Sequence, residues 1–253
     1  MLFWKKNKKL VIRCLTTTEA LAQLLPITRM SRSSPDWWRQ TDPYFDPVIL
    51  EADKGKKRLT PKHNRTVKHC YALQKLWENS IAIPLWSDFI VSVMPDGKAN
   101  GIAPNNPHSG EQHPVAQFPG MISDEWAHFK MVSPWLIYTE EPVQFMLSDP
   151  FYHNQRHEWM TMPGEMEFFY QHHTNINMVF RRSKEATKGI QYEFFAGDIL
   201  AYLSPRTERD FEVVCETIEP KERQSLEWAT KISFHPASWT RKKSIGGCPL
   251  GRD

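Results

Sequence analysis

The chain has 253 residues, enough to bury a sizeable hydrophobic core. Apolar residues make up 40% and charged residues 24% of it, a balance that excludes a disordered chain. The formal net charge is only +3, so the field of the whole protein gives no reason to expect nucleic acid as the main partner.

The four cysteines, Cys14, Cys70, Cys215 and Cys248, lie far apart and form no Cys-x-x-Cys pair. This spacing argues against a cysteine zinc site and against a disulfide framework, so we expect free thiols in a reducing compartment. No apolar run approaches the length that crosses a membrane, and we predict no membrane partner.

The first 80 residues mix strand and helix signals. Residues 9–14 read as a strand, and residues 20–25 as a short helix that Pro26 ends. The run Thr16-Thr17-Thr18 followed by Glu19 suggests a helix start with a capping box. Residues 67–77 follow an amphipathic helical pattern. Their basic surroundings, residues 54–75, suit either phosphate contact or a solvated surface; we do not favour nucleic acid because aromatic residues do not alternate with the charges.

Strand signals begin at residue 81. Residues 81–94 read as strand and residues 95–97 as a turn, after which a returning strand would be expected. The sequence offers instead residues 101–119, which are rich in Asn, Pro, His and Gly. A loop of this length in a compact domain is usually either functional or ordered by a partner, so it is the best place to look for a site.

Further strands are predicted in the second half of the chain. Residues 132–139 and 143–148 suggest a hairpin, and residues 211–218 alternate as a strand. Residues 225–234 are ambiguous between helix and strand, and residues 240–253 read as a tail that a neighbour orders.

The densest β signal lies in residues 190–205. Two apolar runs meet there at Ala196-Gly197-Asp198, and Pro205 ends the second run because proline cannot donate to a strand ladder. We read this stretch as a β-hairpin or corner at the heart of a mostly β domain.

Histidines are the main candidates for chemistry. Imidazoles and carboxylates could converge on a metal in a cupin-like site. The His-x-Asp/Glu pair that such a site needs is absent, so we predict neither a metal site nor a cofactor. No nucleophile elbow or phosphate loop is present, and we predict no catalytic residue. The histidines and carboxylates considered are His108, Glu111, His113, His153, His157, Glu158, His172 and His173.

The chain resembles an uncharacterised family of tailed-phage proteins, found especially in marine and cyanobacterial phages. The landmarks are Cys14, Pro35-Asp36-Trp37-Trp38, Ile83-Pro84-Leu85-Trp86-Ser87-Asp88, Pro134-Trp135, Thr174-Asn175-Ile176-Asn177 and Gly197-Asp198. The resemblance implies a viral protein in the virion or the host cytoplasm, and it implies no known activity.

A second, more local resemblance is to dUTPase-type β-clip domains. It rests on the order of Pro163-Gly164, a polar strand, Asn175-Ile176-Asn177 and then residues 196–203. No Arg-Ser-Gly phosphate motif accompanies it, so this resemblance implies a fold and not an activity.

Together these observations predict a mainly β (α+β) protein, an antiparallel barrel or sandwich with the β-clip as one alternative, and one or two short helices near the N-terminus. We expect an N-terminal α/β extension (residues 1–80), a β-rich core domain (81–235) and a C-terminal tail (236–253). The interaction candidates are Trp37, Trp38, Trp86 and Trp135, because tryptophan is enriched at interface hot spots; the polar-pocket candidates are Asn175, Asn177 and Asp198.

The favoured function is that of a non-enzymatic phage protein, virion-associated or assembly-related, that contacts other phage or host proteins or forms a homo-oligomer. Two alternatives stay open: a dUTPase-fold nucleotide binder or hydrolase, and a metal-dependent cupin-like enzyme.

Overall fold

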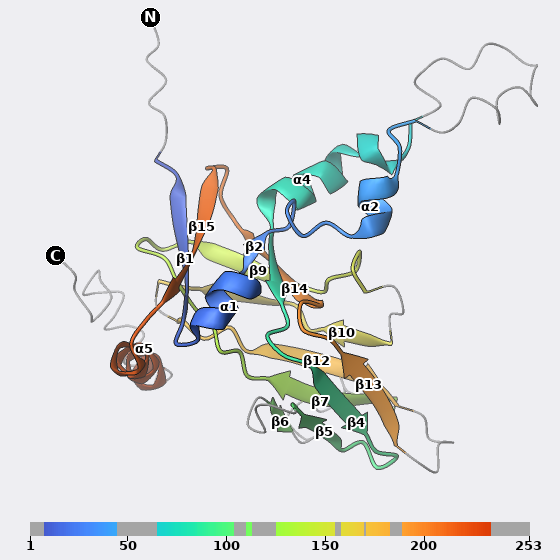
Figure 1. The fold of residues 1–253 in the computed structure, drawn as a ribbon, viewed down its shortest axis with the longest axis vertical. Coiled ribbons are helices and arrows are strands. Elements are labelled where there is room, and N and C mark those ends of the chain that lie inside the picture. Colours follow the sequence, from blue (N-terminus) through green and yellow to red (C-terminus); the bar gives the residue numbers. More distant parts are fainter. Residues whose placement is uncertain are drawn as a thin grey trace, which may run out of the picture.

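The structure is a computed structural model, and it describes residues 8–44, 65–103, 110–112, 125–154, 158–169, 171–182 and 189–233. The fold is mainly β, built from several mostly antiparallel sheets, as predicted, and the described residues form no closed barrel. Figure 1 shows the sheets crossing one another below a pair of helices. The basic residues 54–62, much of the predicted loop at 104–109 and 113–124, and the C-terminal tail lie outside the described residues.

The sheets draw their strands from distant parts of the chain. Their orders are β15-β1-β8, β10-β12-β7-β6, β11-β9-β14-β3-β2 and β13-β4-β5. The strands are β1 (Leu10–Thr16), β2 (Thr28–Arg29), β3 (Ile81–Pro84), β4 (Phe89–Val93), β5 (Ala99–Ile102), β6 (Gly110–Gln112), β7 (Trp126–Met131), β8 (Leu136–Tyr138), β9 (Gln144–Ser148), β10 (Trp159–Thr161), β11 (Gly164–Glu167), β12 (Ile176–Arg181), β13 (Ile190–Phe194), β14 (Ile199–Pro205) and β15 (Phe211–Thr217).

Two of the sheets pack face to face as a sandwich. Strand β4 alternates buried and half-buried residues, the pattern of a strand with one face in the core. Its Phe89 ring lies 5.8 Å from that of Phe129 on β7, and Phe180 on β12 lies 5.2 Å from Tyr192 on β13. Aromatic side chains therefore fill the space between the β13-β4-β5 sheet and the β10-β12-β7-β6 sheet.

The first and last strands of the fold lie side by side (Figure 1). β1 and β15 pair in parallel from Leu10↔Phe211 to Thr16↔Thr217, so this sheet is mixed rather than purely antiparallel. The register places Cys14 opposite Cys215, and both thiols are free. The hydrogen bond with the Cys215 thiol, and then burial, raise the pKa of Cys14.

The stretch at residues 190–205 forms a corner and not a hairpin. β13 pairs with β4, whereas β14 pairs with β3 and β9, so the two runs belong to different sheets. The corner is closed by backbone bonds from Leu85 N to Asp198 O (2.7 Å) and from Gly197 N to Leu85 O (2.8 Å). Gly197 has a φ of +95°, a conformation that glycine adopts without strain.

Two connections differ from the predictions. Residues 132–139 and 143–148 do not form a hairpin, because β8 pairs with β1, and β9 pairs with β11 and β14. Residues 101–119 are not wholly a loop, since β5 returns along β4 and β6 pairs with β7. These polar strands pair through the backbone. Gly101 has no room for a side chain, because a Cβ there would lie 2.3 Å from Phe129 Cζ and 2.5 Å from Phe89 Cε1.

The helices flank the sheets. The described residues before position 80 form three α-helices rather than one or two: α1 (Glu19–Leu24), α2 (Asp36–Gln40) and α4 (Tyr71–Asn79), the last preceded by a 3-10 turn at Val67–His69. The ambiguous residues after 218 form helix α5 (Pro220–Ser233). Thr18 is the N-cap of α1, but it makes no side-chain capping bond, so the predicted capping box is wrong.

A second, smaller core lies under α2 and α4, which extend away from the sandwich (Figure 1). It joins Met30, Leu73, Trp77, Ala82 and Tyr202. Among the described residues, no helix is both long and apolar enough to span a bilayer.

Candidate functional site

A groove of about 920 Å³ opens where the two cores meet. It lies between the end of α1, the segment that leads into α2, the end of β3, the loop before β10, and the corner between β13 and β14. Its lining residues are Leu24, Leu25, Pro26, Thr28, Arg32, Ser33, Ser34, Pro35, Asp36, Arg39, Pro84, His153, Asn154, Glu158, Trp159, Gln191, Tyr192, Glu193, Phe194, Phe195, Gly197, Asp198 and Ile199.

One wall of the groove is the edge of strand β13. Every residue from Gln191 to Phe195 lines it, although Tyr192 and Phe194 point into the core and are only 7% and 3% exposed. Consecutive residues whose side chains alternate between two faces can share one wall only through their backbone. No residue of the neighbouring strand β4 is in the lining, so the groove runs beyond the free edge of this sheet.

Two large apolar side chains stand exposed at the groove. Leu24, the last residue of α1, is 76% exposed, and Phe195, the first residue after β13, is 62% exposed. Exposed apolar residues that converge on one concavity are typical of surfaces that bind another protein.

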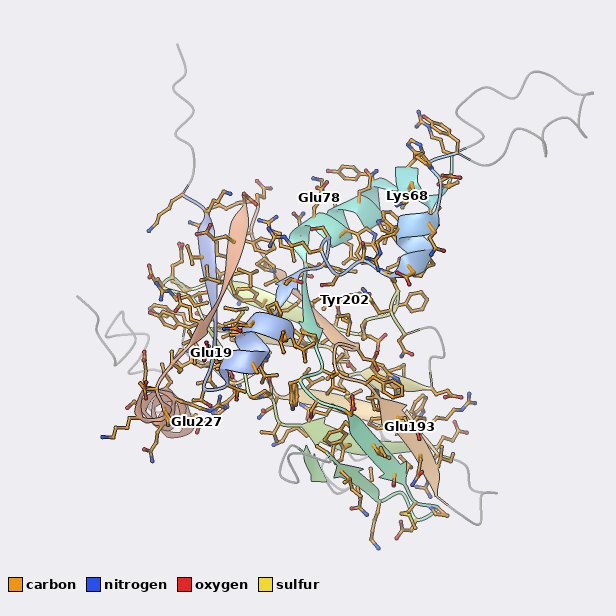
Figure 2. All side chains as sticks on the ribbon, viewed as in Figure 1. Glu19, Lys68, Glu78, Glu193, Tyr202 and Glu227 are labelled. Atoms are coloured by element: carbon orange, nitrogen blue, oxygen red, sulfur yellow. The ribbon has the colours of Figure 1, made fainter. Side chains whose placement is uncertain are left out.

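Acidic groups outnumber basic ones in the lining. Two arginines, Arg32 and Arg39, face four carboxylates, so the formal charge of the groove is −2 in a chain whose total is +3. Asp36 is paired with Arg39 in α2, and the other three carboxylates belong to Glu158, Glu193 and Asp198. Figure 2 labels Glu193, which is exposed on β13.

A half-buried histidine, His153, links two other segments near the groove. The His153 ring nitrogens lie 2.6 Å from the Tyr202 hydroxyl (Nδ1) and 2.7 Å from the Ser33 carbonyl (Nε2). Because a carbonyl only accepts, Nε2 carries the proton and the tyrosine hydroxyl donates to Nδ1. Burial lowers the pKa of His153 and raises that of Tyr202, which keeps both groups neutral.

The carboxylates near the corner accept hydrogen bonds from backbone amides. Asp198 Oδ2 accepts from the Phe195 amide at 2.8 Å, and Asp88 Oδ1 accepts from the Ala196 amide at 2.9 Å. Both ring nitrogens of His153 are likewise occupied. These hydrogen bonds hold the walls of the groove in place.

Two of the four predicted interaction residues are in the core, which corrects that prediction for them. Trp86 is 6% exposed and Trp135 is fully buried, both within the main hydrophobic cluster. An indole in the core cannot meet a partner without unfolding its surroundings. These two tryptophans therefore stabilise the fold.

Trp37 and Trp38 are half-buried on α2, beside the groove. Trp37 donates to the Tyr152 carbonyl at 2.9 Å, and the Trp38 ring lies 5.3 Å from that of Trp77. Their packing against the second core attaches α2 to the sheets.

The three polar-pocket candidates do not share a site. Asp198 lines the groove, but Asn175 and Asn177 do not. Asn177, on β12, lies with its Oδ1 3.3 Å from His128 Nε2 on the paired strand β7. The sequence order that brought these residues together as a pocket thus spans two different sheets.

The histidine candidates form no metal centre in the part of the chain that the structure describes. There, no group of three or more His, Cys, Asp or Glu side chains is placed to hold an ion. His172 is buried, with its Nδ1 3.1 Å from the Phe168 carbonyl. His108, His113 and His157 lie outside the described residues.

The basic region around α4 has aromatic neighbours that its sequence did not reveal. The Lys68 ammonium lies 4.4 Å from the centre of the Trp38 ring, and that of Lys75 lies 5.6 Å from Tyr71. Lys75 also pairs with Glu78 at 2.7 Å. These contacts stay within the helical region, and they give no row of stacking rings along a basic channel.

Fold and groove together define a mainly β protein with an open sheet edge at a groove. Comparison with protein-family models, curated proteins and solved structures finds no match to this chain. The resemblances to tailed-phage proteins and to β-clip domains therefore stay predictions.

Proposed function

We propose that the chain is a non-enzymatic binding protein that holds a partner protein in the groove. The observation that carries the proposal is the contrast between the two kinds of groove residue. Leu24 and Phe195 are exposed and have no structural need to be apolar, whereas the polar groove residues His153 and Asp198 are occupied by hydrogen bonds that shape the walls.

The setting that we propose is a tailed phage, in the virion or during its assembly, with another phage or host protein as the partner. The support is the resemblance of the chain to tailed-phage proteins. A mass-spectrometric inventory of purified particles tests this part, and absence of the chain from the particles would exclude a virion component.

A photo-crosslinking experiment tests the groove. A benzophenone amino acid replaces Phe195 in the full chain, and the matched control carries it at Ile102, which is 60% exposed on the opposite edge of the same sheet. We expect a partner that is captured at position 195 and not at 102. Equal capture at both positions, or capture at neither, would contradict the proposal.

The captured partner then provides the quantitative test. We expect Leu24→Asp and Phe195→Asp to weaken its binding at least about tenfold, because each places a charge where an apolar contact formed. The Ile102→Asp variant should bind as the original chain does.

A further inference from the structure

The hydrogen-bond directions along β4 determine which backbone groups of β13 are free. In the hairpin between β4 and β5, the Met94 amide donates to the Lys98 carbonyl at 2.7 Å. Successive residues of a strand point their N–H and C=O groups to opposite sides. Ser92 and Ile90 therefore also face β5, and Val93 and Val91 face β13.

The pairing of β13 with β4 fixes the directions of the backbone groups of β13 in the same way. Ile190 is opposite Val93 and Tyr192 is opposite Val91, so Ile190 and Tyr192 point their backbone groups toward β4. Gln191 and Glu193 consequently point theirs away from β4, into the groove. Among the described residues, neither makes a backbone hydrogen bond outside its ladder.

We infer that the groove binds its partner by strand addition: an extended, basic segment of another protein pairs with the edge of β13 through Gln191 and Glu193. This inference rests on the proposed function and names the chemistry of the partner. An edge strand presents a row of donors and acceptors that an extended peptide satisfies directly.

The negative charge of the groove favours a partner segment that is positively charged. In an added strand, side chains that lie beside Gln191 and Glu193 share their exposed face. Both residues are exposed, and Glu193 and Glu158 are two of the carboxylates that give the lining its net charge of −2. Lysine or arginine opposite Glu193, with an apolar residue near Phe195, fits this wall.

The experiment begins with a random nine-residue peptide library displayed against the full chain. Enriched peptides should carry lysine or arginine at alternate positions, and they are synthesised for affinity measurement by fluorescence anisotropy. Enrichment of acidic peptides, or of none above the empty support, would overturn the inference.

A matched pair of variants isolates the backbone contact. Gln191→Pro removes the N–H that faces the groove, while Gln191→Ala keeps it, and proline is tolerated on an edge strand when its nitrogen faces outward. We expect Gln191→Pro to weaken the peptide at least about tenfold, with Gln191→Ala within about twofold. Equal affinities for the two variants would overturn strand addition.

The peptide provides a test that needs no change in the protein. Methylating the amide nitrogens at alternate positions should abolish binding in one register, where the amides face β13, and leave it intact in the other. Equal effects in both registers would refute the pairing.

The remaining outcomes separate the two proposals. If Phe195→Asp abolishes peptide binding while Gln191→Pro does not, the groove binds a partner without strand addition. Sedimentation measures whether the chain forms an oligomer. If it does, and if Gln191→Pro dissociates that oligomer, the added strand comes from a second copy of the chain. That result would overturn the assignment to another protein.

Discussion

The corner between β13 and β14 yields a prediction that can be worked from two glycines. Gly197 has a φ of +95°, and a Cβ added there would lie 3.6 Å from Leu25 Cδ2, an ordinary contact. Gly197→Ala therefore causes no steric overlap, and its cost is that of placing an L-residue at positive φ, about 1–2 kcal/mol. For a chain of this size we expect the melting temperature to fall by about 2–8 °C.

Gly164 on β11 provides the control. A Cβ added there would meet nothing within 4 Å, and its φ is ordinary. Gly164→Ala should leave stability unchanged or raise it by up to about 1 kcal/mol, because alanine restricts the unfolded chain. Urea unfolding followed by tryptophan fluorescence measures both variants. If they unfold at the same urea concentration, the corner does not have the positive-φ turn from which we derive the free edge of β13.

Three further changes have defined outcomes. Gly101→Ala should lower the free energy of unfolding by about 1–3 kcal/mol, because its Cβ would lie 2.3 Å from Phe129 Cζ; a stability within 0.5 kcal/mol of the original would refute the close packing. Burial lowers the pKa of His153, so the histidine of the unfolded chain binds a proton first as the pH falls below about 6.5. The free energy of unfolding should then drop by up to about 1.4 kcal/mol per pH unit until the lowered pKa of the folded state is reached. The His153→Gln variant should lack this pH-dependent component. Trp135→Ala should destabilise the chain by about 3–5 kcal/mol and Trp38→Ala by less, since only the first indole is fully buried; the reverse order in urea unfolding would contradict their placement.

Much of the fold could be predicted because a strand with one face in a core alternates apolar and polar residues along its sequence. β4 and β13 show this alternation, β14 is the continuous apolar run of a strand buried on both faces, and the Gly-Asp pair marks the corner. β5 and β6 were missed since short polar strands pair through the backbone, which leaves no side-chain pattern. Pairing partners were missed as well: nothing local in residues 132–148 indicates that β8 joins β1.

The candidate site was harder to predict than the fold. Tryptophan is enriched at interfaces, but it also fills cores, and residue type alone does not separate Trp135 from Trp38. The groove is assembled from five segments of the chain, and one wall is a strand edge whose sequence looks like that of any half-buried strand. The exposed Leu24 and Phe195 gave no signal, because each stands next to an apolar residue, Leu25 or Phe194, that is half-buried or buried.

The corner also explains why β13 has a free edge at all. The side of β13 away from the groove is occupied by β4, so a hairpin over residues 190–205 would have laid β14 along Gln191 and Glu193 and closed the groove. The turn at Gly197 instead sends β14 between β3 and β9, where it becomes a central strand. The residues with the strongest strand signal thus build two sheets, and their separation leaves backbone donors and acceptors facing the groove. An exposed edge invites unwanted pairing unless charges guard it, and Glu193 on that edge would repel acidic segments while it admits basic ones.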